Sequence, residues 1–188
     1  MSRKSLGKIL PLNGDRHTVH GSASGQEPPS RVVVLGVGNM LLSDEGVGVH
    51  VVNALAAQYQ ETSDVAITDG GTGGMELLPL LDGAGHLIVV DALRCGQPPA
   101  CIVRLEYAEV PAYFKTKLSP HQVGISDLLA ALAFKGAVPG HVVLIGVEPA
   151  NLSLGMELSP ELQECLEEVK NVVVAELEAI GHPIHPRI

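Results

Sequence analysis

The sequence is poor in aromatic residues and has no tryptophan, with aromatics at 3 % of its 188 residues. Its core must therefore be aliphatic, drawn from the apolar residues that make up 46 % of the chain. This composition suits a parallel sheet covered by helices, because such a sheet is buried on both faces. The length fits one domain with a substantial core.

Further shortages exclude whole classes of protein. The three cysteines, Cys95, Cys101 and Cys165, form no C-x-x-C pair, which argues against a disulfide framework or a cysteine-rich zinc site. Reduced thiols of this kind are typical of a cytoplasmic protein. No apolar run approaches the ~18 residues of a membrane span, and the apolar stretch 9–12 is too short for a signal peptide. Basic clusters are missing too, and the net charge of −9 argues against binding to nucleic acid.

The chain divides into three parts by composition. Residues 1–30 are rich in Gly, Ser, Pro and charge without any period, which predicts a poorly ordered extension. Residues 31–180 alternate apolar runs with helical periods, the pattern of βα units. We therefore expect one α/β domain over 31–180 and a C-terminal tail over 181–188.

The alternation predicts a twisted, mostly parallel five-stranded sheet with helices on both faces. The strands are expected at 31–36, 64–68, 86–91, 101–106 and 141–147. The helices are expected at 45–59, shortly after Gly74, at 120–133 and at 160–180, with Ser119-Pro120 and Ser159-Pro160 starting the last two. Only about nine residues separate the third strand from the fourth, whereas a parallel crossover needs a dozen or more. The fourth strand is therefore expected to run antiparallel, near an edge of the sheet.

A glycine turn, Gly36-Val37-Gly38, follows the first strand and invites a dinucleotide-binding interpretation. Such a site needs a third small residue for access to the pyrophosphate, and this chain has Leu41 there. The acidic pair that follows would also repel a pyrophosphate. We interpret these glycines as the residues that let the backbone turn sharply and bring the acidic pair over the sheet edge. A nucleotide-binding domain remains an alternative function.

Acidic residues occur where two predicted strands end. Asp44 and Glu45 follow the turn after the first strand, and Asp91 ends the apolar run 87–90 of its expected neighbour. Capping of a helix start can by itself explain one of the first two. An acid that ends a buried strand has little structural purpose. Parallel strands end at one edge of the sheet, and open α/β sheets bind their ligands there.

A histidine is expected at the same edge. His121 falls in the first turn of the helix predicted at 120–133, where the positive helix end keeps the imidazole neutral and able to donate a lone pair. Taken alone, a histidine in the first turn of a helix is usually just a surface residue. Two carboxylates and one imidazole that converge make a three-ligand site with open positions, suited to a borderline divalent transition metal.

A glycine-rich stretch, TDGGTGG at 68–74, follows the second predicted strand. Its glycines can simply shape a tight connection. Alternatively, Gly70, Gly71 and Thr72 bind substrate through their N–H groups, with Asp69 near the reacting carbonyl. Motifs that supply a nucleophile are absent, since the sequence has no G-x-S-x-G elbow and no H-E-x-x-H helix.

Together these motifs resemble the hydrogenase maturation proteases, the endopeptidases that process the large subunit of nickel–iron hydrogenases. The resemblance rests on GVGNMLLSDEGVG, DGGTGG, VVDAL and SPHQVGISDLL, and it covers roughly residues 31–180. It implies a single α/β domain that acts on a hydrogenase large-subunit precursor in the cytoplasm. The reaction it implies is removal of the precursor's C-terminal extension after nickel has been inserted.

The resemblance also implies roles for single residues. The metal ligands of the family fall at Glu45, Asp91 and His121, and we expect Asp44 to cap or support them. The nickel belongs to the precursor, so no permanently bound cofactor is expected. Our hypothesis for the chemistry is that a bound water attacks the scissile bond with the help of Asp69. A non-catalytic chaperone that senses nickel would use the same ligands and remains a second alternative.

Overall fold

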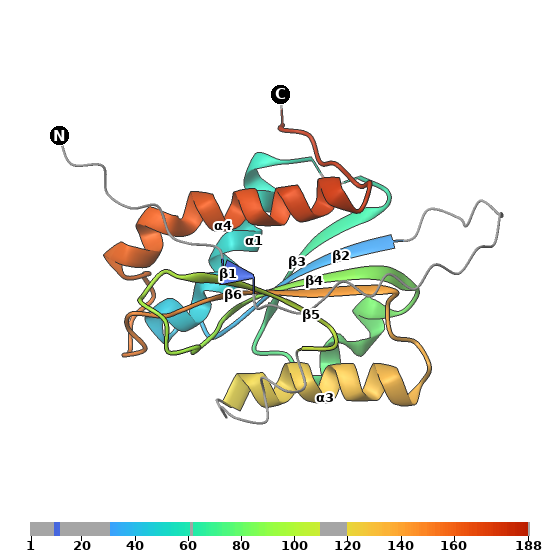
Figure 1. The fold of residues 1–188 in the computed structure, drawn as a ribbon, viewed down its shortest axis with the longest axis horizontal. Coiled ribbons are helices and arrows are strands. Elements are labelled where there is room, and N and C mark those ends of the chain that lie inside the picture. The colour runs from blue at the N-terminus through green and yellow to red at the C-terminus, as the bar shows by residue number, and fades with distance from the viewer. Residues whose placement is uncertain (1–9, 12–30, 61, 110–119, 188) are drawn as a thin grey trace.

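The computed structural model describes residues 10–11, 31–60, 62–109 and 120–187, and it gives only the backbone of 10–11, 120–124 and 126. One mixed sheet lies between two layers of helices (Figure 1). The strands are β1 (Leu10–Pro11), β2 (Arg31–Val37), β3 (Val65–Gly71), β4 (Ala84–Ala92), β5 (Ile102–Glu106) and β6 (His141–Val147). The helical elements are η1 (Ser43–Gly46), α1 (Val47–Gln58), η2 (Met75–Leu81), α3 (Pro120–Phe134) and α4 (Pro160–Ala179).

The sheet has the order β1-β5-β6-β4-β2-β3. Neighbours among β3, β2, β4 and β6 are parallel, and β5 runs antiparallel to β6, as the short connection after β4 predicts. The predicted α/β class and its five strands are confirmed. The two-residue β1 adds a sixth strand beside β5. It lies in the predicted N-terminal extension, and the rest of that extension and Ser119 lie outside the described residues.

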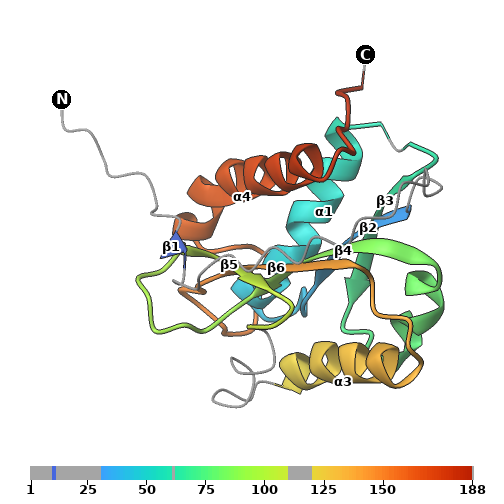
Figure 2. The same ribbon diagram turned by 45° about the vertical axis from the view of Figure 1, so that its right-hand side comes forward.

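Alternate residues of β2 contribute to two different cores. Val32 and Val34 belong to the core that includes α1 and α4, while Val33 and Leu35 belong to the core that includes α3. All four side chains are completely buried, because β2 lies in the middle of the sheet with a helical layer on either face. Figure 2 shows α1 and α4 on one face and α3 on the other. No helix in the described ranges has the length and apolar character that a membrane crossing needs.

Helix α1 lies very close to the sheet at the carboxyl ends of β2 and β4. A Cβ on Gly48 would lie 2.1 Å from the carbonyl oxygen of Val90 and 2.4 Å from that of Val37. Gly38 has a φ of +137°, and a Cβ there would lie 1.8 Å from the carbonyl oxygen of Glu45. Gly38 of the predicted glycine turn therefore lets the turn that carries Glu45 lie against the sheet edge, and Gly48 lets the start of α1 do the same.

The first predicted helix differs in its beginning. A single α-helix over 45–59 was expected, but a 3-10 turn, η1, comes first and α1 begins at Val47. The backbone N–H of Glu45 donates to the carbonyl of Leu42 at 3.1 Å, a bond across three residues. Glu45 therefore lies in the 3-10 turn before the α-helix. The last helix begins as predicted, since the hydroxyl of Ser159 accepts a hydrogen bond from the backbone of Leu162.

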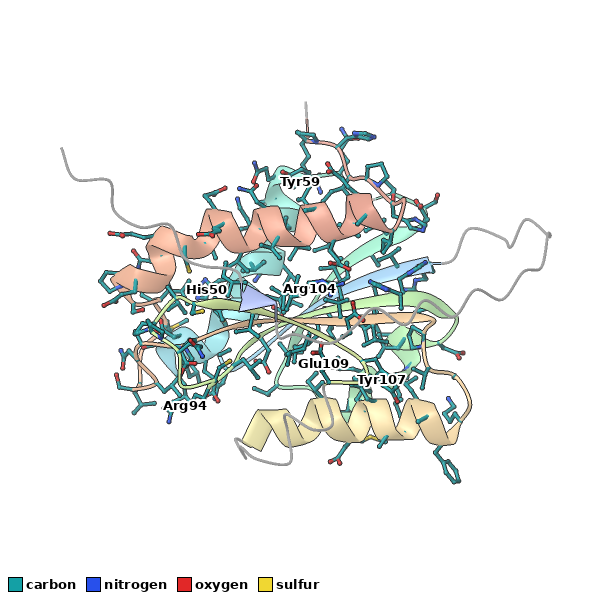
Figure 3. All side chains as sticks on the ribbon, viewed as in Figure 1. His50, Tyr59, Arg94, Arg104, Tyr107 and Glu109 are labelled. Carbon is teal, nitrogen blue, oxygen red and sulfur yellow. The ribbon has the colours of Figure 1, made fainter. Side chains whose placement is uncertain are left out.

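The opposite edge of the sheet carries a group of three histidines. The ring centre of His86 lies 5.7 Å from that of His141 and 5.4 Å from that of His182. Burial lowers the pKa of His86, and the charges of the other two histidines lower it further. Nearby, Arg104 donates two hydrogen bonds of 2.8 and 2.9 Å to Glu176, which link β5 to α4 (Figure 3).

Candidate active site

The candidate site lies where the parallel strands β2, β4 and β6 end. η1 follows β2 after the turn 38–42, and the loops after β4 and β6 emerge at the same end of the molecule (Figures 1 and 2). The first turn of α3 also lies at this end. The carboxyl edge of the sheet therefore collects three segments that sequence analysis selected, the acidic turn after β2, the end of β4 with Asp91 and the first turn of α3, together with the loop after β6.

Asp91 lies inside the sheet at this edge. It pairs with Gly146 of β6, and β4 continues to Ala92, one residue beyond its predicted end. The residue is 2 % exposed, and its Oδ2 atom is buried without a hydrogen-bond partner among the described residues. Burial raises the pKa of Asp91 well above its ordinary value, against a hydrogen bond from the backbone of Ala92 that lowers it. An acid so placed is costly to ionise unless a cation lies beside it.

Glu45 is the second acid of the site. It lies in η1 and is only 8 % exposed. Its charge raises the pKa of Asp91 further, so the two carboxyl groups are near enough to interact through space. Two like charges held together at a buried position repel each other, and a cation between them relieves both that repulsion and the cost of burial. The arrangement is therefore suited to a positively charged ligand.

Asp44, the neighbour of Glu45, has a different environment. Its carboxylate is completely buried, and Oδ2 accepts hydrogen bonds from the backbone N–H groups of Ala150 at 2.9 Å and Asn151 at 2.7 Å. Oδ1 accepts a third from Ser159 at 2.7 Å. Asp44 caps neither η1 nor α1, since neither has a side-chain cap. The expected supporting role is confirmed: Asp44 fastens the loop after β6 to the turn that carries Glu45.

His121 belongs to the first turn of α3 by its backbone, as predicted. Its side chain lies outside the described side chains, so its approach to the two acids stays a prediction. Among the side chains that are described, no three His, Cys, Asp or Glu groups are arranged to hold a metal ion. Asp91 and Glu45 thus form the described part of the predicted ligand set, and His121 is the third ligand that the sequence predicts.

The glycine-rich stretch forms the end of β3 and the turn after it. The strand continues to Gly71, beyond the expected end at residue 68, because Asp69 pairs with Gly36 and Gly71 with Val37. The exposed Asp69 accepts a hydrogen bond from the N–H of Gly71 at 2.8 Å through Oδ1. The carbonyl of Gly71, which has a φ of +49°, in turn accepts a bond from Gly38 at 2.8 Å. The stretch therefore has the structural role expected of a tight connection, and its role with substrate stays a proposal.

Comparisons with known proteins agree with these features. A family model described as hydrogenase maturation protease matches residues 49–176. The chain belongs to the hydrogenase maturation protease family. It is 42 % identical over 158 residues to the hydrogenase 2 maturation protease of Escherichia coli K12. The aligned region covers 84 % of this chain and 96 % of that protein.

Solved structures of other maturation proteases have the same fold. The hydrogenase maturating endopeptidase HybD from E. coli superposes with a TM-score of 0.80 at 42 % identity, over 84 % of this chain and 98 % of that one. A [NiFe] hydrogenase maturation protease HybD from Thermococcus kodakarensis superposes with a TM-score of 0.65 at 25 % identity, over 76 % and 96 %. The protein is therefore a peptidase of this family, and the predicted enzyme class is confirmed.

The glycine turn of this maturation protease does not favour the nucleotide-binding alternative. The carbonyl oxygen of Glu45 occupies the space where Gly38 lacks a side chain. In a dinucleotide-binding site the pyrophosphate occupies the space beside this glycine, and backbone N–H groups point toward the pyrophosphate. Here the chain itself fills the turn, and it does so with an acceptor oxygen.

One buried acid of the protease was missed by sequence reasoning. Glu148 directly follows β6 and is 7 % exposed, and its Oε2 accepts hydrogen bonds from the N–H groups of Cys95 at 2.6 Å and Gln97 at 3.1 Å. These bonds shape the loop after Asp91, which also carries the exposed Arg94 at this end of the molecule (Figure 3). An acid directly after an apolar strand is the signal that selected Asp91, and it could have selected Glu148 too.

Proposed function

We propose that this protease removes the C-terminal extension of a nickel–iron hydrogenase large-subunit precursor in the cytoplasm, after nickel has been inserted. The nickel is part of the substrate, and Glu45, Asp91 and His121 recognise it. The names of the relatives support the substrate class. The cysteines, odd in number and without a C-x-x-C pair, support the reducing compartment.

The buried carboxyl group of Asp91 carries this proposal. A structural acid in this position would have its oxygens satisfied by backbone N–H groups, as those of Asp44 are. Asp91 instead has one buried oxygen without a partner among the described residues, and its neighbour is a second acid. Carboxylate oxygens with an imidazole nitrogen are a suitable set for a borderline divalent ion such as nickel.

The protein groups then have distinct tasks. Glu45 and Asp91 are held by the sheet edge and hold the metal-bearing part of the precursor in register with the site. A metal bound there supplies positive charge and polarises an adjacent carbonyl. Gly70, Gly71 and Thr72 lie along the extended peptide; because the N–H of Gly71 already donates to Oδ1 of Asp69, donation to the peptide falls to Gly70 and Thr72. Asp69 accepts a proton from the attacking water through its other carboxylate oxygen and returns it to the amine that leaves when the peptide bond breaks.

The experiment is cleavage of the purified precursor, in its nickel-loaded and nickel-free forms, followed by mass spectrometry of the large subunit. The wild-type protein should remove the extension from the loaded form alone. The Glu45→Gln, Asp91→Asn and His121→Ala variants should lose binding and cleavage together. Asp69→Asn should still bind the loaded precursor and fail to cut it, because only the chemical step needs its carboxylate.

Asp82→Asn is a matched control, since it removes an exposed acid beyond η2 and should cleave as the wild type does. Thermal melting of each variant separates loss of the site from loss of the fold. Binding of the loaded precursor without any cleavage would identify a chaperone that senses nickel. Equal cleavage of the two forms would exclude recognition of the metal, and full activity of Asp69→Asn would remove that residue from the chemistry.

A further inference from the structure

Three large apolar side chains are exposed together beside the candidate site. Leu41 is 58 % exposed, Leu154 is 85 % exposed and Met156 is 63 % exposed. Leu41 lies in the turn before η1, and the other two lie in the loop between β6 and α4. We call these three residues the apolar patch. Large apolar side chains that are exposed as a group commonly mark sites where another protein binds.

Backbone pairing brings the two parts of the apolar patch together. Leu42 and Gly155 form a parallel bridge, in which the N–H of Gly155 donates to the carbonyl of Leu41 at 3.1 Å. The N–H of Ser43 donates in turn to the carbonyl of Gly155 at 2.7 Å. This register places Leu41 beside Leu154, with Met156 on the other side of Gly155.

The loop that presents the patch is fastened at both ends. Asp44 holds its beginning at Ala150 and Asn151 and its end at Ser159. In between, the hydroxyl of Ser43 donates to the carbonyl of Ser153 at 3.1 Å. Because the loop is fixed in this way, the exposure of its apolar side chains is not a result of flexibility, and the fold itself does not require apolar residues at these positions. A fixed, exposed apolar surface binds a partner without the entropic cost of ordering the loop.

The patch is continuous with the place that the substrate must reach. Leu41 precedes Glu45 by four residues, and the pairing at Ser43 ties the patch to the same 3-10 turn. A folded precursor that brings its cleavage segment to Glu45 and Asp91 must also cover the surface beside η1. A second copy of this chain on the patch would block that approach.

We propose that Leu41, Leu154 and Met156 form a docking surface for an apolar surface segment of the hydrogenase large-subunit precursor, outside the segment that is cut. This inference rests on the proposed function. It makes the apolar patch a determinant of which precursor the protease accepts, because the patch contacts the folded body of the substrate and takes no part in the chemistry.

The test is the kinetics of cleavage of nickel-loaded precursor by the double variant Leu154→Ser, Met156→Ser. The KM should rise about tenfold or more, because two exposed anchors are lost from the interface, while kcat stays within twofold of the wild type. The control is Phe134→Ser, which removes an even more exposed apolar side chain, 95 % exposed, at the end of α3. Its KM should equal that of the wild type.

Several outcomes would overturn the proposal. An unchanged KM in the double variant, or an equal rise in Phe134→Ser, would show that the patch makes no specific contact. A fall in kcat alone would place the effect in the chemistry. Sedimentation that shows a dimer only in the wild type would assign the patch to a second copy of this chain. If the wild type cleaves nothing, the proposed function fails by itself, and the affinity of wild type and variant for the precursor still decides whether the patch binds it.

Discussion

Replacement of Asp44 should cost stability in proportion to the hydrogen bonds that each variant loses. Asp44→Ala removes the acceptor of three backbone N–H groups, those of Ala150, Asn151 and Ser159. A hydrogen bond to a charged group contributes ~1.5–3 kcal/mol, and bonds within one cluster are not additive. We therefore expect the free energy of unfolding to fall by about 4 kcal/mol. That is a large part of the ~5–15 kcal/mol that holds a typical domain together.

Asp44→Asn should be intermediate. Its amide oxygen can keep the two bonds to Ala150 and Asn151, but its NH₂ group then faces the N–H of Ser159, so one bond is lost at a buried position. We expect a loss of about 2 kcal/mol. The control is Ser159→Ala, which removes only the 3.4 Å capping bond to Leu162 and should cost about 1 kcal/mol or less.

Urea unfolding at neutral pH, with a common slope for all variants, measures these differences. A loss below 1 kcal/mol for Asp44→Ala would refute the inference that Asp44 fastens the loop. An equal loss for Asp44→Ala and Asp44→Asn would refute the division of the bonds between the two carboxylate oxygens.

Two further predictions concern the fold. Gly48→Ala should cost about 3 kcal/mol or more by thermal or urea unfolding, because its Cβ meets two backbone oxygens that cannot move aside; Gly140→Ala, with its nearest neighbour at 3.8 Å, should lie within about 0.5 kcal/mol of the wild type. Burial and the charges of His141 and His182 lower the pKa of His86 in the folded protein. Just below the ordinary value of 6.5, His86 therefore binds a proton in the unfolded chain but not in the folded chain. The penalty that His86 imposes on the free energy of unfolding should therefore be absent above about pH 6.5, the ordinary value, and should grow as the pH falls below it. His86→Asn should show a smaller fall in melting temperature from pH 7.5 to 5.5, and an unchanged fall would contradict this assignment.

The arrangement of the strands could be predicted because it depends on local pattern and length. The central strands are continuous apolar runs, such as Val32–Leu35, which only a sheet covered on both faces can bury. The short connection after β4 was enough to predict an antiparallel β5. The position of Asp91 at the sheet edge followed from the same pattern, since an acid after a buried run must lie where the strand ends.

The partners of the acids could not be predicted in this way. Asp44 and Glu45 are neighbours of similar chemistry, and the sequence assigned Asp44 its supporting role only through the family resemblance. What distinguishes them is a loop from the far end of the chain, and nothing in residues 150–159 signals that its N–H groups point at Asp44. The 3-10 turn at η1 likewise depends on the contact of Ser43 with Gly155. Contacts of this kind exist only in the folded chain.

The long sequence separation between Asp44 and its hydrogen-bond partners also determines when the active site can form during synthesis of the protein. Its three partners lie 106, 107 and 115 residues further on. A ribosome makes the chain from its amino end, so the turn that carries Glu45 emerges long before the segment that secures it. The nascent protein can assemble β2, α1 and β3 early, but its active site is complete only when the segment that leads into α4 has packed against Asp44. A chain truncated before α4 should therefore be inactive.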